Sequence, residues 1–171
     1  MSGGQQAVSD LNVAAAAAVH RLVDRHETLA TAESLTGGMV AATIVEIPGV
    51  SAVFRGGLVV YATELKHTLA DVPEDLLAKG GPVDPDVALA LAAGARERCG
   101  ADWGLATTGV AGPEPQDGKP VGLVYVAVAG PAGATVRELR LSGARAEIRG
   151  ASVTAALELL TEQIRLAPTP V

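Results

Sequence analysis

The sequence has few aromatic side chains: among 171 residues only Phe54, Tyr61, Trp103 and Tyr125 are aromatic. Apolar residues nevertheless make up 49% of the chain. The core must therefore be built from alanine, valine, leucine and isoleucine, which suit helices packed closely on a sheet. A chain of this length can bury such a core as one domain, and its composition argues against disorder outside the chain ends.

Cysteine and runs of basic residues are also scarce. The single thiol, Cys99, excludes a disulfide framework and a CxxC motif, so we expect a cytoplasmic protein. The net charge is -6 with no run of lysine or arginine, which argues against a nucleic-acid partner. His20, His26 and His67 do not have metal-ligand spacing, even together with Cys99. We therefore expect neither a metal nor another cofactor.

Long apolar runs are missing as well. The first ten residues lack the basic segment followed by an apolar segment that makes a signal peptide. The run VAAAAAV is too short to span a bilayer, so it reads as part of an alanine-rich helix. We therefore expect no membrane partner. The apolar composition and the modest charge favour a homo-oligomer.

Apolar strands alternate with helices over most of the chain. We expect helices over residues 11–26 (capped by Asp10), 37–47, 63–70 (capped by Thr63), 73–79, 85–99 and 145–164, and strands over residues 28–32, 53–62, 102–109, 121–130 and 134–143. The clearest helix has Asp84 as its cap, Pro85 at its first position and Gly100 just past its end. The last two strands are close enough to form a hairpin.

This order of elements predicts an α/β protein, a three-layer α/β/α sandwich with a mixed, mostly parallel sheet. No internal repeat or linker divides the chain. We therefore expect a single domain over residues 1–171, with residues 1–8 and 167–171 as mobile tails.

The stretch TAESLTGG, at the end of the first expected strand, carries more polar groups than a connection needs. If the N–H groups of Thr36, Gly37 and Gly38 point one way at a helix start, they form an anion site. Ser34 would then lie beside a pocket for an oxyanion or a phosphate. The alternative is that Ser34 or Thr36 only caps the helix. The role of Glu33 stays open between capping and orienting its neighbours.

The stretch VVYATELK places Tyr61 at a strand end and Lys66 in the next helix. Across a strand-to-helix corner the two side chains can converge. A lysine beside apolar strands can lose its proton and serve as a general base, and a tyrosine can relay that proton. The alternative is a surface lysine beside a half-buried tyrosine.

Two further segments carry polar groups. A long loop rich in glycine and proline follows the strand that ends in Thr108 and Gly109, and such loops often carry function. It is not a P-loop, because its glycine-to-lysine spacing is one residue too long and no helix follows. Arg145 begins the last helix, where a positive charge opposes the helix dipole. An anionic ligand, shared with Arg149, would explain it; solvated surface arginines are the alternative.

Taken together, the motifs TAES-x-TGG, GG-x-x-x-Y-x-x-x-x-K, TG-x-AGP and SGARAEIR occur in an order that resembles the CinA carboxy-terminal family, the nicotinamide-nucleotide amidohydrolases known as PncC. The resemblance runs from about Leu22 to Leu160, and the chain looks like the stand-alone form. It implies hydrolysis of the carboxamide of nicotinamide mononucleotide to nicotinate mononucleotide and ammonia, without a metal, in the pyridine nucleotide cycle. Leu35 departs from the cysteine common in the family.

The resemblance also implies roles for single residues. The family's nucleophile falls on Ser34, and its tyrosine and lysine fall on Tyr61 and Lys66. The threonine of TG-x-AGP falls on Thr108, followed by Gly109, and the arginine after SG falls on Arg145. Whether main-chain N–H groups or Arg145 hold the phosphate stays open. So do two other functions: a non-catalytic module that binds a nucleotide or a partner, and an amidase for another nucleotide amide.

Overall fold

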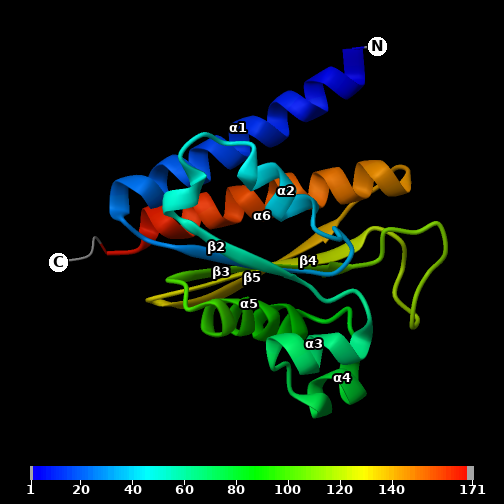
Figure 1. Ribbon diagram of the computed structural model, residues 1–171. Helices are drawn as coiled ribbons and strands as arrows, with labels where there is room; N and C mark the ends of the chain where they lie inside the picture. The colour runs from blue at the N-terminus through cyan, green and yellow to red at the C-terminus, as the bar shows by residue number, and fades with distance from the viewer. Residues whose placement is uncertain (1, 169–171) are drawn as a thin grey trace.

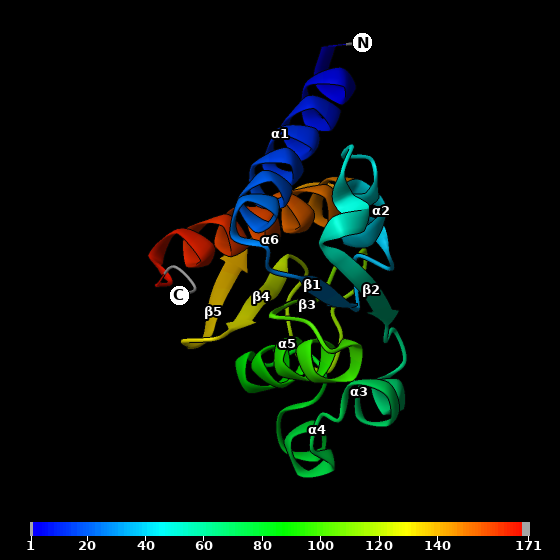
Figure 2. The same cartoon turned by 60° about the vertical axis from the view of Figure 1, so that its left-hand side comes forward.

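The computed structural model describes residues 2–168 and confirms the expected α/β class, with one five-stranded sheet between two layers of helices (Figure 1). Seen from two directions, α1 (Ser2–Arg25), α2 (Met39–Val45) and α6 (Arg145–Leu166) cover one face of the sheet (Figures 1 and 2). The helices α3 (Thr63–Ala70), α4 (Glu74–Gly80) and α5 (Pro85–Cys99) lie on the other face. A short 3₁₀ turn, Val50–Ala52, precedes β2.

The sheet has the strand order β2 (Phe54–Val59), β1 (Leu29–Glu33), β3 (Trp103–Gly109), β4 (Leu123–Gly130), β5 (Gly133–Arg140). Strand β1 pairs in parallel with β2 and β3, whereas β4 pairs antiparallel with β3 and β5. Four strands therefore share one direction and β4 runs against them. The expected hairpin is confirmed, with Pro131 and Ala132 in its turn.

The carboxyl ends of β1, β2 and β3 meet at one edge of the sheet. Glu33 is in register with Val59 on one side and with Thr107 on the other. The chain leaves all three strands at this edge, so segments that follow them in sequence become neighbours in space. This is where open α/β sheets usually place their ligand sites.

Small side chains let the layers approach closely. A Cβ built on Gly94 of α5 would lie 1.8 Å from the main-chain oxygen of Ala70, and one on Gly104 of β3 would lie 1.9 Å from that of Ala92. Neither position has room for a side chain. The close contact of α5 with α3 and with the sheet therefore needs small residues, in line with the scarcity of aromatic side chains.

Several helix boundaries differ from expectation, and local geometry explains them. Helix α1 begins at Ser2, so Asp10 lies inside the helix and does not cap it. Helix α2 begins at Met39 because Gly37 and Gly38 have φ of +58° and +98°, which a right-handed helix excludes. Thr63 is the first residue of α3, and Ala62 holds the cap position. The Asp84 cap of α5 is confirmed, since its carboxylate accepts from the first-turn N–H groups.

The two expected tails lie partly within the described residues. Residues 2–8 continue the backbone of α1, while Met1 lies outside the described residues. At the other end, the Arg25 guanidinium donates to the carbonyls of Ala167 (3.4 Å) and Pro168 (2.6 Å). These two residues are therefore held against α1, and residues 169–171 lie outside the described residues.

Candidate active site

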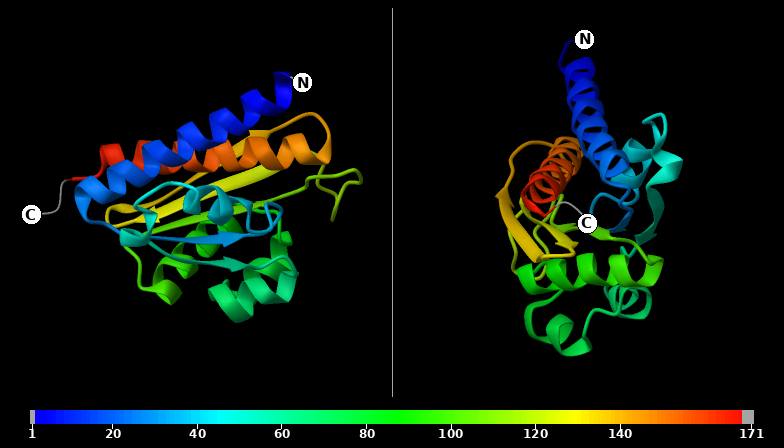
Figure 3. Two further views of the ribbon diagram at one scale, coloured as in Figure 1. Left: turned by 45° about the horizontal axis from the view of Figure 1, so that its top comes forward. Right: turned by 90° about the vertical axis from the view of Figure 1, so that its left-hand side faces the viewer.

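A cavity opens at the carboxyl edge of the parallel strands. Its walls come from the turn after β1, the corner between β2 and α3, the connection before α5, the loop over residues 110–122 and the start of α6. That loop extends past the edge of the sheet, near the beginning of α6 (Figure 3). Six of the nine expected site residues line the cavity: Ser34, Tyr61, Lys66, Thr108, Gly109 and Arg145.

The other three expected residues, Thr36, Gly37 and Gly38, do not line it, and Glu33 explains why. The buried Glu33 carboxylate accepts from the N–H of Gly38 (3.1 Å) and from the Thr36 hydroxyl (2.6 Å). It also accepts from Val40 and Ala41, two of the first N–H groups of α2. The expected anion site at this helix start is therefore wrong, because a carboxylate of the chain itself occupies it.

Ser34 leaves β1 at the cavity and meets Lys66 from α3. The Lys66 Nζ lies 3.1 Å from Ser34 Oγ, within hydrogen-bond distance. The same Nζ donates to the carbonyl oxygens of Val60 (2.8 Å) and Tyr61 (3.4 Å). Both side chains are buried, with exposed fractions of 8% for Ser34 and 1% for Lys66. The nucleophile and base expected from sequence are thus brought together across 32 positions of the chain.

The environment of Lys66 changes its protonation. Burial of the amine lowers the pKa of Lys66 from 10.5 to about 8, because the ammonium form loses its hydration; the nearby Glu64 carboxylate opposes this effect. A substantial fraction of Lys66 is therefore neutral near pH 8. A neutral amine beside a serine hydroxyl is the arrangement that a general base needs.

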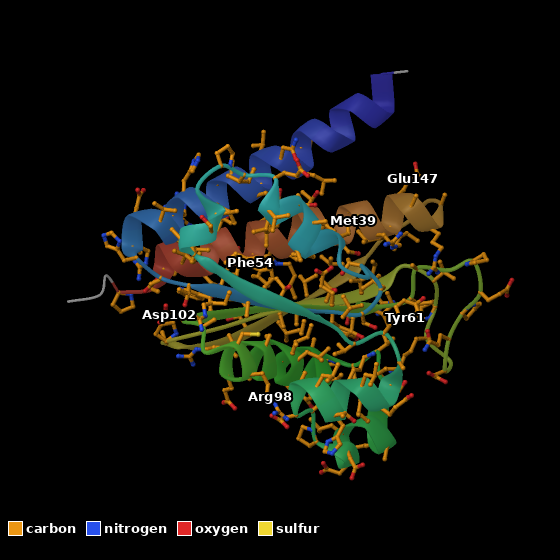
Figure 4. All side chains as sticks on the ribbon, viewed as in Figure 1. Met39, Phe54, Tyr61, Arg98, Asp102 and Glu147 are labelled. Atoms are coloured by element: carbon orange, nitrogen blue, oxygen red, sulfur yellow. The ribbon has the colours of Figure 1, made fainter. Side chains whose placement is uncertain are left out.

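Tyr61 lies at the mouth of the cavity, at the sheet edge between α3 and the start of α6 (Figure 4). Its side chain is 59% exposed. The Tyr61 hydroxyl accepts from Arg145 Nη2 at 3.0 Å, and Arg145 Nη1 donates to the carbonyl of Gly112. The Tyr61 side chain was expected to converge with that of Lys66, but Lys66 Nζ contacts the Tyr61 main-chain carbonyl, and the Tyr61 hydroxyl contacts Arg145 instead.

The strand end of β3 forms the opposite wall. The buried Thr108 hydroxyl donates to the carbonyl of Pro82 at 2.6 Å and so fixes the connection before α5 against the cavity. Its oxygen retains acceptor capacity. Next to it, a Cβ on Gly109 would lie 2.7 Å from the carbonyl oxygen of Leu123. Glycine is thus required there for β3 and β4 to pair beside the cavity.

The sequence did not point to Pro82 and Val83 as lining residues. Their only local signal is their place directly before the capped start of α5, which brings them to the same sheet edge as Ser34. Nor did the sequence show that Arg149 donates to main-chain carbonyls. That contact depends on how α6 crosses the sheet, and no spacing reveals it.

In the described part of the chain, no group of three or more His, Cys, Asp or Glu side chains is arranged to hold a metal ion. No helix in the same residues combines the length and the apolar character of a membrane span.

Comparison with known proteins identifies relatives over nearly the whole chain. The model of the CinA C-terminal domain matches residues 11–164. A CinA-like protein of Frankia casuarinae is 51% identical over 147 residues, which are 86% of this chain and 34% of the relative. A putative competence-damage inducible protein of Desulforamulus reducens is 46% identical over 138 residues, 81% of this chain and 34% of the relative. The chain thus spans about a third of the length of these curated relatives.

Solved structures agree with this result. The competence/damage inducible protein CihA of Agrobacterium tumefaciens superimposes with a TM-score of 0.86 at 36% identity, covering 91% of this chain and 96% of that one. A CinA superfamily protein of Klebsiella pneumoniae gives 0.88 at 27% identity, covering 92% and 99%. The motifs, the fold and the matched residues agree, and the chain belongs to the CinA C-terminal domain family.

Proposed function

We propose that this chain hydrolyses the carboxamide of nicotinamide mononucleotide to nicotinate mononucleotide and ammonia, with Ser34 as nucleophile and Lys66 as general base. The observation that carries the proposal is the 3.1 Å contact between Lys66 Nζ and Ser34 Oγ in a buried, cavity-facing position. A module that only binds a nucleotide has no need to keep a lysine out of water against a serine.

The acceptors around Lys66 support the role of base. A main-chain carbonyl can only accept a hydrogen bond. The two hydrogens of a neutral Lys66 amine are therefore directed to the carbonyls of Val60 and Tyr61. The remaining lone pair of Nζ then faces the Ser34 hydroxyl. After proton transfer the ammonium has three donors for these three acceptors, so the charged form is also satisfied.

The reaction follows in two halves. Ser34 Oγ attacks the amide carbon while its proton moves to Lys66 Nζ, and the C–N bond then breaks as Lys66 returns the proton to the departing nitrogen, which releases ammonia. Water next attacks the resulting ester, again giving a proton to Lys66. As the ester C–O bond breaks, Lys66 Nζ returns that proton to Ser34 Oγ, which restores Ser34 and the neutral amine, and the acid product loses its own proton to solvent as the carboxylate. No oxidant, reductant or metal enters this balance.

Charge that develops on the carbonyl oxygen needs N–H donors within the cavity. The N–H groups of Gly37 and Gly38 are bonded to the Ser34 carbonyl and to Glu33, so they do not serve. Leu35 lines the cavity directly after Ser34, and the N–H after the nucleophile fills this role in α/β-hydrolases. We therefore assign the oxyanion to the main chain at Leu35, a donor worth about 3 kcal/mol in other hydrolases.

The size of the cavity favours a definite orientation of the substrate. It encloses about 110 Å³, less than the roughly 300–1,000 Å³ of sites that bury a whole small molecule. The carboxamide end would enter beside Ser34, and the phosphate would stay at the open mouth beside Arg145. Two N–H groups of Arg145 are used by Gly112 and Tyr61, and the rest of its five donors remain for a phosphate.

The direct experiment is ammonia release by the purified chain with nicotinamide mononucleotide, in the presence of a chelator, with Ser34→Ala as the control. We expect turnover that depends on Ser34 and does not change on chelation. A panel with the nucleoside, free nicotinamide and other nucleotide amides separates this activity from a related amidase. Tight nucleotide binding without ammonia release from any of them would favour a non-catalytic module.

A further inference from the structure

Arg149, in the second turn of α6, does not point into the cavity. Its guanidinium donates through Nε to the carbonyl of Leu35 and through Nη2 to the carbonyl of Thr36, each at 2.9 Å. These are the first two residues after Ser34. The anion-sharing role expected for Arg149 is therefore not what its position indicates, since Arg149 does not line the cavity and two of its N–H groups are bonded to the main chain.

These two bonds set the direction of the peptide planes beside Ser34. In a trans peptide the C=O and the following N–H point opposite ways. With both carbonyls turned to Arg149, the N–H groups of Thr36 and Gly37 must face away from it. The Gly37 N–H does so, because it donates to the Ser34 carbonyl at 3.0 Å. Arg149 thus holds the turn that carries Ser34 in one orientation.

The position of Arg149 ties this turn to the rest of the cavity. Arg145, one helical turn earlier on α6, contacts the Tyr61 hydroxyl and the carbonyl of Gly112. The start of α6 therefore contacts the turn after β1 through Arg149 and the cavity mouth through Arg145. An arginine near a helix start opposes the dipole, and its bonds to two carbonyls offset that cost.

We propose that Arg149 is a positioning residue that keeps Ser34 Oγ within reach of Lys66 Nζ; this inference rests on the proposed role of Ser34 as nucleophile. Arginine suits the task because its planar fork reaches two acceptors at once, whereas lysine is a point donor. Nucleophilic attack is sensitive to such placement, since a displacement of about 1 Å can cost roughly 100-fold in rate.

The test compares Arg149→Ala and Arg149→Lys with wild type in steady-state hydrolysis of nicotinamide mononucleotide. We expect kcat of Arg149→Ala to fall about 10- to 100-fold while KM changes less than about threefold. Arg149→Lys should have a kcat between those of wild type and Arg149→Ala. This variant keeps the proposal testable if Arg149→Ala does not fold. Added guanidinium ion at low millimolar concentration should restore part of the kcat of Arg149→Ala. A rise in KM with unchanged kcat would overturn the proposal.

Arg137→Ala is the matched control. Arg137 of β5 contacts Glu162 of α6 at 2.6 Å and does not line the cavity, so this variant also removes a half-buried arginine that tethers α6. Its kcat should equal that of wild type, and guanidinium should have no effect on it. An equal loss of kcat in Arg137→Ala and Arg149→Ala would show that α6 packing, not the turn after Ser34, matters.

Hydrogen exchange separates failure of this inference from failure of the proposed function. If the wild-type chain releases no ammonia, the proposed function fails, yet the positioning contact is still testable. In Arg149→Ala, the amides of residues 35–38 should exchange at least about tenfold faster than in wild type and in Arg137→Ala, with the sheet unchanged. Unaltered exchange of these amides would overturn the role of Arg149 whatever the activity.

Discussion

Glu33 and Lys66 are both buried to about 1% exposure at the same sheet edge, yet their surroundings are opposite. The Glu33 carboxylate accepts four hydrogen bonds, three from main-chain N–H groups and one from a hydroxyl. The Lys66 amine meets two carbonyls and the hydroxyl of Ser34. The partners of Glu33 only donate hydrogen bonds to its carboxylate, whereas Lys66 faces the Ser34 hydroxyl, which can give up a proton.

The difference in hydrogen-bond partners gives Glu33 and Lys66 different roles at one site. A buried charge whose partners are all fixed stabilises the local fold, here the turn that leads into α2. A buried amine whose pKa falls to about 8 is ready to exchange a proton at ordinary pH. The two groups adjoin because Ser34 directly follows Glu33, so the carboxylate holds the turn that carries the proposed nucleophile.

The largest expected effect is a loss of turnover when Ser34 or Lys66 is replaced. Ser34→Ala and Lys66→Ala should each lower kcat by at least about 1,000-fold, and the double variant should be little worse than either, since nucleophile and base act as a unit. Lys66→Arg should not restore activity, because arginine stays protonated. Steady-state kinetics measures this, with circular dichroism as the folding control. A folded Lys66→Ala that keeps most of its kcat would refute the assignment of the base.

Replacing Glu33, the structural member of this comparison, should lower the free energy of unfolding. Glu33→Ala leaves the buried N–H of Val40 and the half-buried N–H groups of Gly38 and Ala41 without their acceptor, and an unsatisfied buried group costs about 1–3 kcal/mol. We expect the free energy of unfolding to fall by about 3 kcal/mol or more in urea titrations. Glu158→Ala, an exposed position on α6, is the control and should stay within about 0.5 kcal/mol of wild type. A Glu33→Ala chain as stable as that control would contradict the structural role.

The buried lysine should lower stability in a pH-dependent way. Its pKa is about 8 in the folded chain and 10.5 as an ordinary value, so between these pH values the unfolded chain holds a proton that the folded chain has released. Stability should therefore rise as pH rises from 8 to 10.5, and below pH 8 the full cost, about 3 kcal/mol, remains. The same pKa should govern the rise of kcat/KM with pH.

Lys66→Met tests this cost directly. At pH 7 it should be more stable than wild type by about 2 kcal/mol, because the burial cost disappears while the Val60 carbonyl loses a donor worth about 1 kcal/mol. This advantage should shrink as pH approaches 10.5, and Lys79→Met, at an exposed position of α4, should have no such pH dependence. Equal stability of wild type and Lys66→Met from pH 7 to 10.5 would show that the amine is not desolvated.

The smallest expected effect lies at the exposed mouth, outside both buried charges. Arg145→Ala should raise KM for nicotinamide mononucleotide about tenfold, as expected for loss of one charge-assisted hydrogen bond, and should weaken discrimination against the nucleoside without phosphate. Tyr61→Phe should have a smaller effect of the same kind, because it removes only one partner of Arg145. Equal loss on both substrates would point instead to a structural or transition-state role.

Much of this arrangement was predictable from local sequence signals. The cap and stop signals around α5 placed Asp84, Pro85 and Gly100 correctly. Motif order indicated the family, and the parallel pairing of β1 with its neighbours follows from strands separated by helices. The start of α2 was predicted two residues early, because the left-handed conformation of Gly37 and Gly38 is not visible in a hydrophobic pattern.

Periodicity, caps and motif spacing act over a few residues, so the amino-acid sequence alone specifies the class of fold, the order of elements and which side chains are available at the sheet edge. Which of those groups are bonded within the chain follows from its tertiary structure. Glu33 fills the start of α2, Arg149 reaches back 114 positions to Leu35, and burial beside Val60 and Ser34 sets the protonation of Lys66. Hydrogen-bond partners and desolvation depend on segments distant in sequence, and no local pattern encodes them.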